Sequence, residues 1–478
     1  MTDRTGPTPP RDGANAGCGT SDPAAFEPAG VATASVTDQL VGSLYRRAEE
    51  VARAAVTRHG RGWDPTPVID TLLTSRVTGL PIMLLALAAV LWVTVVGANY
   101  PSQVLTHLLF GLEEKLTLLF GALGAPAWLH GVLVLGMYRG LAWVVSVMLP
   151  PMAIFFPCFT LLEDLGYLPR VAFNLDAVFK RSGACGKQAL TMSMGFGCNA
   201  AGVIACRIID SPRERMIALL TNNFTVCNGR FPTLIALSTV FVGEGTKQVL
   251  GPGLAASLAV VGIVLTGVAV TFAVSWLLSR TLLRGVPSFF ALELPPFRRP
   301  RVGQVLVRSL LDRTVFVLTR AVLVAAPAGA LVWVLANTSV GGHSVLAHLA
   351  SFLEPAGRLL GLDGFILTAF ILGLPANEIV LPILLMSYLS GGTMVEAESL
   401  QTLGGVLVAN GWTQLRALCF MLFSLLHWPC ATTILTVWNE TRDRRWTLAA
   451  VLLPTAVAVV VCSAVAHTGR LLAALAAG

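Results

Sequence analysis

The chain has 478 residues, of which 55% are hydrophobic and only 12% are charged. Soluble domains carry roughly 25% charged residues, so this composition excludes a soluble globular enzyme and indicates an all-α polytopic membrane protein. The net charge of +7 is typical of basic cytoplasmic loops between membrane spans. The basic residues form no face with interleaved aromatics, so we expect no nucleic-acid partner.

The N-terminal part of the chain precedes the hydrophobic region. Residues 1–36 are rich in Pro, Gly, Ala, Thr and Ser and contain no apolar signal-peptide core, which predicts a disordered arm. Residues 37–62 have helical periodicity but are too charged to span, which predicts a cytoplasmic or interfacial helix. Residues 63–478 form the predicted transmembrane transport domain, whose surroundings are membrane lipid.

About nine hydrophobic segments follow within residues 63–478. A helix needs about 20 apolar residues to cross about 30 Å of hydrocarbon, and we do not expect all of the segments to cross. The segments run from Leu80 to Ala98, Gly131 to Leu162, Gln188 to Cys206, Met216 to Val242, Leu254 to Ser279, Val315 to Leu335, Phe365 to Tyr388, Leu415 to Val437 and Trp446 to Ala466.

Two of these segments contain residues that interrupt a membrane helix. GFGCNAAGVIACR starts at Gly195, and LGLPANEIVLP starts at Leu372. Glycine weakens a helix, and loose backbone at membrane depth is tolerated only inside protein or beside a water-filled cavity. We therefore predict two gate regions, at residues 188–242 and 363–437, that line a path. The alternative is that the small residues only let helices pack closely.

The charges of the flanking loops indicate how the two segments enter the membrane. Residues 188–206 have basic flanks on both sides, and short basic loops prefer the cytoplasm. The loops on both sides of residues 365–388 are predicted to lie on the external side of the membrane. Two re-entrant segments from opposite sides would form an inverted repeat with a site near the midplane. A functional basic flank that breaks the positive-inside rule is the alternative.

The candidate site residues are those that are unusual at membrane depth. Cys198, Asn199, Cys227, Glu378 and Cys430 all lie beside interrupted helix. Ionisable groups inside a membrane are expensive and mark functional sites, and thiolates with N and O donors suit a divalent transition metal such as Fe²⁺. We predict that these side chains form a metal site. A buried thiol that only packs is the alternative for each cysteine.

Spacing along the chain restricts which of these residues can meet. Cys198 and Cys206 are eight residues apart, about 12 Å along a helix, whereas two thiolates on one metal lie within roughly 4.6 Å. A shared site must therefore combine thiols from different segments. Glu163 and Asp164 close a hydrophobic segment and are added as supporting metal ligands, although they could equally mark only a membrane interface.

The interrupted segments resemble those of FeoB-type ferrous iron transporters. GFGCNAAGVIACRIIDSPRERMIALLTNNFTVCNGRFPT is similar to that family's first gate, LGLPANEIVLP to its second gate, and LLHWPCATTILTVWNETRDRRW to its late Pro-Cys segment. LLEDLGYLPRVAFNLDAVFKRSG and SRVTGLPIMLLAL also look like family segments, so the resemblance runs from about Leu40 to Ala466. It implies two gates, Fe²⁺ as the transported substrate and regulation by a GTPase.

Three features depart from the family pattern. The family normally begins with a cytosolic GTPase domain, and no P-loop is present in this sequence. The second gate usually reads Ala-Lys-Glu, but here Asn377 stands between Ala376 and Glu378. Two alanines follow Asn199 where the family has a proline close by. These departures bear on the identity of the transported substrate more than on the fold.

We predict a multi-pass transporter of Fe²⁺ in the cytoplasmic (inner) membrane, not an enzyme, with no permanently bound cofactor. A GTPase would be supplied by a separate protein, or the chain would work without one, and a homo-oligomer is a further expectation. One alternative is a transporter of nucleosides or other small solutes, which should show an amide and aromatic lining. The other is a non-transporting membrane scaffold that docks a soluble enzyme through the basic loop from Arg280 to Arg313.

Overall fold

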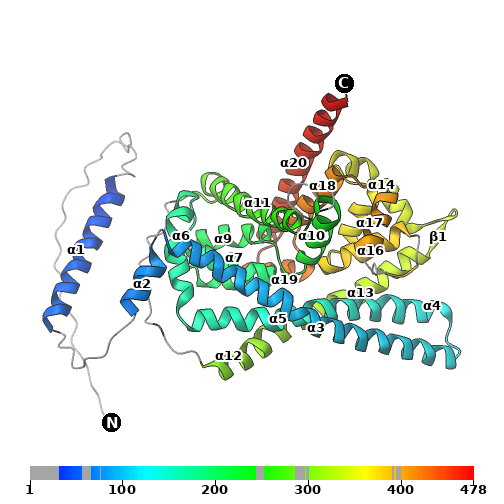
Figure 1. Cartoon of the computed structure of the whole chain (residues 1–478), viewed down its shortest axis with the longest axis horizontal. Helices are drawn as coiled ribbons and strands as arrows, with labels where there is room; N and C mark the ends of the chain where they lie inside the picture. Colours follow the sequence, from blue (N-terminus) through cyan, green and yellow to red (C-terminus); the bar gives the residue numbers. More distant parts are fainter. Residues whose placement is uncertain are drawn as a thin grey trace, which may run out of the picture. The chain divides into compact units, whose positions relative to one another are not determined.

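The structure is a computed structural model of the whole chain (Figure 1). It describes residues 32–55, 66–75, 77–243, 252–285, 297, 301–389, 392–394 and 400–477. Apart from one short hairpin, β1 (Ser339–Val340) with β2 (His343–Ser344), the elements in these ranges are helices. The predicted all-α class is therefore confirmed.

The chain divides into two compact units, residues 1–64 and 65–478. In the first unit, α1 runs from Ala32 to Ala55. The helix predicted at residues 37–62 thus begins five residues earlier, inside the predicted arm. Residues 1–31 of that arm and residues 56–62 lie outside the described residues.

The second unit holds all the hydrophobic segments. Its helices, including short π and 3₁₀ stretches labelled η, are α2 (Thr66–Thr74), α3 (Gly79–Ala122), α4 (Ala127–His130), η1 (Gly131–Tyr138), α5 (Arg139–Asp164), α6 (Tyr167–Arg181), α7 (Lys187–Gly197), α8 (Asn199–Ala205), η2 (Cys206–Ile208), α9 (Pro212–Thr221), η3 (Asn222–Phe224), α10 (Phe231–Leu237), η4 (Ser238–Gly243), α11 (Pro252–Arg280), α12 (Val302–Arg308), η5 (Ser309–Val315), α13 (Phe316–Asn337), α14 (Val345–Leu359), α15 (Gly364–Leu372), η6 (Asn377–Ile379), α16 (Val380–Tyr388), α17 (Leu400–Ala409), α18 (Gln414–Leu426), α19 (Ala431–Thr441) and α20 (Arg444–Ala477).

Among the described residues, five helical stretches are long and apolar enough to cross a membrane. The number rises to six if α14 and α15, which meet at 109°, form one bent span. The five stretches are Gly79–Ala122, Ala127–Asp164, Leu254–Arg280, Gln414–Thr441 and Arg444–Leu475. The predicted count of about nine segments is not confirmed, because several of them are divided into helices too short to span.

A scaffold of long helices supports the interrupted ones. Figure 1 shows α3 lying beside α5, and α13 packs against α5 and η1. Glycines allow the closest approach, since a Cβ on Gly329 would lie 2.3 Å from the carbonyl oxygen of Gly136. An ion pair at 2.7 Å between Arg139 and Glu113 joins α5 to α3. The inner face of α5 then packs on Cys198 and its neighbours, in a buried cluster with Phe155.

A polar network fixes the ends of the second gate region. The Tyr388 hydroxyl donates to Asp363 Oδ2 at 2.5 Å, and Trp412 Nε1 donates to the Tyr388 oxygen at 2.9 Å. Asp363 also caps α15 by accepting from the Ile366 N–H at 2.7 Å. The network therefore ties the start of α15, the end of α16 and the start of α18 together.

Candidate functional site

Four helix breaks define the candidate site. The first break is the single residue Cys198 between α7 and α8, and the third is residues 373–376 between α15 and η6. Cys198 has φ −155° and ψ 125°, and Ala376 has φ −153° and ψ 126°, so both are extended where a helix would otherwise continue. The second break is residues 222–230 before α10, and the fourth is residues 427–430 before α19.

The first and third breaks share a glycine and an asparagine at the same spacing. Gly195-Phe196-Gly197-Cys198-Asn199 aligns with Gly373-Leu374-Pro375-Ala376-Asn377, so each extended residue is followed by asparagine. Each is also followed in the chain by a second interrupted pair, α9–α10 after the first break and α18–α19 after the third. This order agrees with a repeat. Its inversion across a membrane stays a prediction, because no membrane side is defined in the structure.

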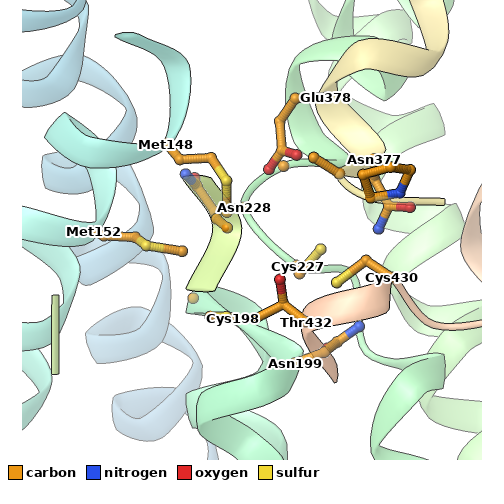
Figure 2. A pocket seen from close by; sticks show the side chains of 15 residues that line it. Met148, Met152, Cys198, Asn199, Cys227, Asn228, Asn377, Glu378, Cys430 and Thr432 are labelled. Carbon is orange, nitrogen blue, oxygen red and sulfur yellow. The ribbon is translucent and has the colours of Figure 1, made fainter. Parts of the chain in front are cut away.

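All four breaks contribute side chains to one small cavity, which we call the gate pocket (Figure 2). Its volume is about 30 Å³. The lining residues are Met148, Met152, Gly197, Cys198, Asn199, Cys227, Asn228, Gly229, Ala321, Pro375, Ala376, Asn377, Glu378, Cys430 and Thr432. Segments up to 284 residues apart in the sequence, from Met148 to Thr432, therefore meet at this point.

Five of the seven predicted site residues line the gate pocket: Cys198, Asn199, Cys227, Glu378 and Cys430. Figure 2 shows the sulfur atoms of Cys227 and Cys430 pointing toward one another. The thiol of Cys430 lies 3.2 Å from the Thr433 hydroxyl. Cys198 lies within electrostatic range of both other thiols. The structure thus brings together three cysteines that the sequence separates by more than 200 residues in total.

The predicted acids Glu163 and Asp164 lie elsewhere. Both are exposed at the end of α5, where Asp164 Oδ2 accepts from the backbone N–H of Arg301 at 3.2 Å. Neither is among the residues that line the gate pocket. Their role as metal ligands stays a prediction that the pocket geometry does not support. The sequence suggested it because both acids stand near other motifs, but such a position does not fix how deeply a side chain lies in the protein.

Glu378 contributes the carboxylate of the gate pocket. It is only 8% exposed, and it packs directly on Gly229, where a Cβ would lie 1.8 Å from Glu378 Oε1. Gly229 therefore has no side chain for a steric reason: the carboxylate occupies that space. This contact joins the second break to the third.

Arg230 is a buried cation behind the gate pocket, with 1% exposure. It donates to the carbonyl oxygens of Asn223 at 3.2 Å and Leu425 at 2.8 Å, while its Nε has no hydrogen-bond partner among the residues that the structure describes. No ion pair with Glu378 is found within the described part of the chain. Arg230 thus links the second break to the end of α18, just before the fourth break, and places a positive charge near the thiols and Glu378.

Asparagine side chains join the first, second and fourth breaks. Asn222 Nδ2 donates to the Asn199 carbonyl oxygen at 2.9 Å, and Asn223 Nδ2 donates to the His427 carbonyl oxygen at 2.6 Å. The side-chain amides of Asn199 and Asn223 lie 3.3 Å apart. A Cβ on Gly202 would lie 2.5 Å from Asn222 Oδ1. Gly202 therefore meets a packing need, and the asparagines beside it make this closely packed segment polar.

Ligand geometry for a resident metal is not preassembled. Across the ranges that the structure describes, no group of three or more His, Cys, Asp and Glu side chains is close enough to hold a metal ion. A cation in the gate pocket would draw on further donors, such as the amide oxygens of Asn199, Asn228 and Asn377, or on a closer approach of the thiols.

Sequence reasoning missed Met148 and Met152, which enter the gate pocket from α5. Methionines within an apolar span give no signal of their own. Their four-residue spacing, which puts both on one helical face, was the available clue.

Two ion pairs involve charged residues near the ends of the helices, and of their four partners only Glu440 falls within a candidate span, as its penultimate residue. Lys187 Nζ lies 2.6 Å from Asp210 Oδ2 and lowers the pKa of that carboxyl below its ordinary value. Arg207 makes a bidentate contact with Glu440, at 2.8 and 2.6 Å, which raises the pKa of the Arg207 guanidinium. The second pair ties the segment after α8 to the end of α19.

Two protein-family models match the chain. The Gate model, described as nucleoside recognition, matches residues 145–241 and 318–444, and the model of the ferrous iron transport protein B C terminus matches residues 260–312. The two parts of the Gate match contain all four helix breaks. The fold and the match together define a multi-pass membrane protein of the Gate class.

Curated relatives narrow the class further. The Fe(2+) transporter FeoB of Synechocystis sp. is 30% identical over 394 residues, which cover 81% of this chain and 61% of the relative. The Fe(2+) transporter FeoB of Staphylococcus aureus strain MSSA476 is 27% identical over 407 residues, covering 82% of this chain and 57% of the relative. A fusion of Fe(2+) transport protein A and Fe(2+) transporter FeoB from Porphyromonas gingivalis is 24% identical over 483 residues, which cover 91% of this chain and 55% of the relative.

Over the matched region, the chain belongs to the FeoB family. It spans roughly three-fifths of the length of these relatives. No solved structure matches the chain significantly.

Proposed function

We propose that this chain transports Fe²⁺ across the cytoplasmic membrane through the gate pocket. The observation that carries the proposal is the convergence of Cys198, Cys227 and Cys430, from three different helix breaks, on one buried cavity with Glu378. Two relatives are named Fe(2+) transporter FeoB, which agrees with this substrate.

The side chains would act as temporary ligands. An entering hydrated ion would exchange waters for the thiolates, for the amide oxygens of Asn199 and Asn377, and for the Glu378 carboxylate. Because no three His, Cys, Asp or Glu side chains are preassembled among the described residues, the ion would be held loosely enough to leave. Binding that permits both entry and exit is what a transport path requires.

The size of the gate pocket bears on the nucleoside alternative, which the description of the Gate model keeps open. Sites for small organic molecules usually enclose about 300–1,000 Å³. A cavity of about 30 Å³ is far below that range but accommodates a single ion. In this conformation the pocket therefore favours an ion over a nucleoside.

The test is uptake of Fe²⁺, Zn²⁺, Mn²⁺ and a radiolabelled nucleoside into proteoliposomes that contain this chain alone. We expect Fe²⁺ uptake, its loss in Cys198→Ser, and full activity in the control Cys462→Ser, whose thiol is buried in α20 away from the pocket. Nucleoside uptake without metal uptake would replace the proposal. If Cys198→Ser and Glu378→Gln were both fully functional in iron-dependent growth, the scaffold alternative would be favoured.

A GTPase, in the same or a separate polypeptide, is the partner that the family resemblance implies, and we propose that it regulates the flux. The Porphyromonas gingivalis relative, named as a fusion with Fe(2+) transport protein A, makes a second protein partner reasonable. Flux that responds to an added GTPase and GTP, but not to a non-hydrolysable analogue, would support regulation by hydrolysis. The homo-oligomer and the absence of a permanent cofactor stay predictions.

A further inference from the structure

Five sulfur atoms line the gate pocket. Three belong to the thiols of Cys198, Cys227 and Cys430, and two belong to the thioethers of Met148 and Met152. Figure 2 shows both methionine side chains extending from α5 toward the break residues. Soft sulfur donors therefore approach the cavity from two sides, the breaks on one side and α5 on the other.

The inner face of α5 carries both aromatic and sulfur-containing side chains. Met152, Phe155 and Phe159 follow one another on this face, and Phe155 fills the space beside Gly197, where a Cβ would lie 2.2 Å from its ring. An aromatic side chain thus fills the space where α5 packs on the backbone of Gly197. At the cavity itself the same face presents Met148 and Met152 instead.

The donor atoms of the pocket, more than its net charge, indicate which cation it suits. Arg230 is fully buried, and it lies close enough to Cys227 and Cys430 to interact with both electrostatically. The repulsion between this guanidinium and a bound ion is set against the attraction of the Glu378 carboxylate and of the thiolates, and both scale with the charge of the ion. Thioethers are neutral donors, and soft thiolate and thioether ligands suit Cu(I).

We propose that Met148 and Met152 are ligands of the gate pocket and that they allow it to bind a soft monovalent cation, Cu(I). The inference deepens the proposed function, since it concerns the same pocket, but it makes a claim about binding that does not depend on iron flux. It also assigns a role to two residues outside the four breaks.

The first experiment observes the methionines directly. The full chain, labelled with ¹³C at the methyl groups of its 11 methionines, is titrated in lipid nanodiscs with Ag⁺, a redox-inert probe for Cu(I), in excess over its nine cysteines. Met148→Leu and Met152→Leu assign the two resonances. Met216 in α9, which does not line the pocket, is the internal control.

We expect the Met148 and Met152 resonances to shift as Ag⁺ binds, while the Met216 resonance stays in place. Shifts absent from both pocket methionines, or equal to that of Met216, would overturn the proposal. Leu and Met are similar in volume, so the variants should fold.

The second experiment measures affinity by competition with a chromophoric Cu(I) chelator. Removing both thioethers should weaken Cu(I) binding by about 10- to 100-fold, the usual loss when groups supporting a metal site are removed. Met216→Leu should bind as wild type does, and an unchanged affinity in the double variant would refute the role of the thioethers. Fe²⁺ uptake is measured on the same preparations: Ag⁺ shifts without uptake would refute only the proposed function, and uptake without shifts only this inference.

Discussion

Gly229 offers a sharp test of the carboxylate in the gate pocket. In Gly229→Ala the new Cβ would start 1.8 Å from Glu378 Oε1 and 2.4 Å from its Cδ. To restore an ordinary contact of 3.4 Å, the oxygen must move by about 1.6 Å. Metal–ligand distances tolerate only about 0.2 Å. The substitution should therefore remove the carboxylate from the ion while leaving it in the protein.

Affinity and stability should respond differently. The displaced atoms are the end of a flexible side chain, so we expect the free energy of unfolding to change by less than about 1 kcal/mol. The concentration of Fe²⁺ for half-maximal uptake should rise by about 10- to 100-fold. Gly262→Ala in α11 is the control, because a Cβ there has nothing within 4 Å.

A double-mutant cycle with Glu378→Gln separates the carboxylate from other effects. If Gly229→Ala acts only by moving that carboxylate, the double variant should be no worse than Glu378→Gln alone. Fully additive losses would contradict the reasoning, and so would normal uptake by Gly229→Ala alongside impaired uptake by Glu378→Gln. A large loss of thermal stability in Gly229→Ala would show that the backbone moves to relieve the contact, and not the Glu378 side chain.

Three further predictions concern the surroundings of the pocket. Arg230→Met leaves two buried carbonyls without their charged donor, so we expect the free energy of unfolding to fall by about 3 kcal/mol in detergent; unchanged stability would show that the cost of burying the charge cancels its hydrogen bonds. Gly202→Ala places a Cβ 2.5 Å from Asn222 Oδ1, and overpacking of this kind should lower stability by about 1–3 kcal/mol, with an unchanged Tm contradicting a rigid contact. Since Lys187 lowers the pKa of Asp210, this ion pair stabilises the fold above the ordinary carboxyl pKa of about 4, and its contribution is lost as the pH falls through the lowered value. The effect on Tm should be small at this exposed site and should weaken with salt. It should disappear from the pH profile of Tm in Asp210→Asn.

The sequence predicted the pocket thiols because each stands beside an interruption that hydrocarbon does not tolerate. Glycine, proline and asparagine next to Cys198 and Glu378 were sufficient to mark the breaks. The spacing argument then required thiols from different segments to meet, and the structure brings Cys198, Cys227 and Cys430 to one cavity.

Other features were hidden from sequence reasoning for physical reasons. Met148 and Met152 are ordinary residues of an apolar helix, and only packing reveals that their face meets the breaks. Glu163 and Asp164 are as polar as Glu378, but their position at a helix end places them outside the pocket. The span count could not be fixed, since hydropathy cannot distinguish one long apolar helix from two short ones joined by a break.

Cys198 and Ala376 adopt nearly the same backbone conformation, and each stands before an asparagine, yet one carries a thiol and the other a methyl group. The bend is therefore set by the ends of the adjoining helices and does not need the side chain at its centre. Shape and chemistry are separate properties at this position, so a thiol can be gained or lost there without rebuilding the membrane domain. A family constructed in this way can diverge in what it carries while its architecture stays unchanged.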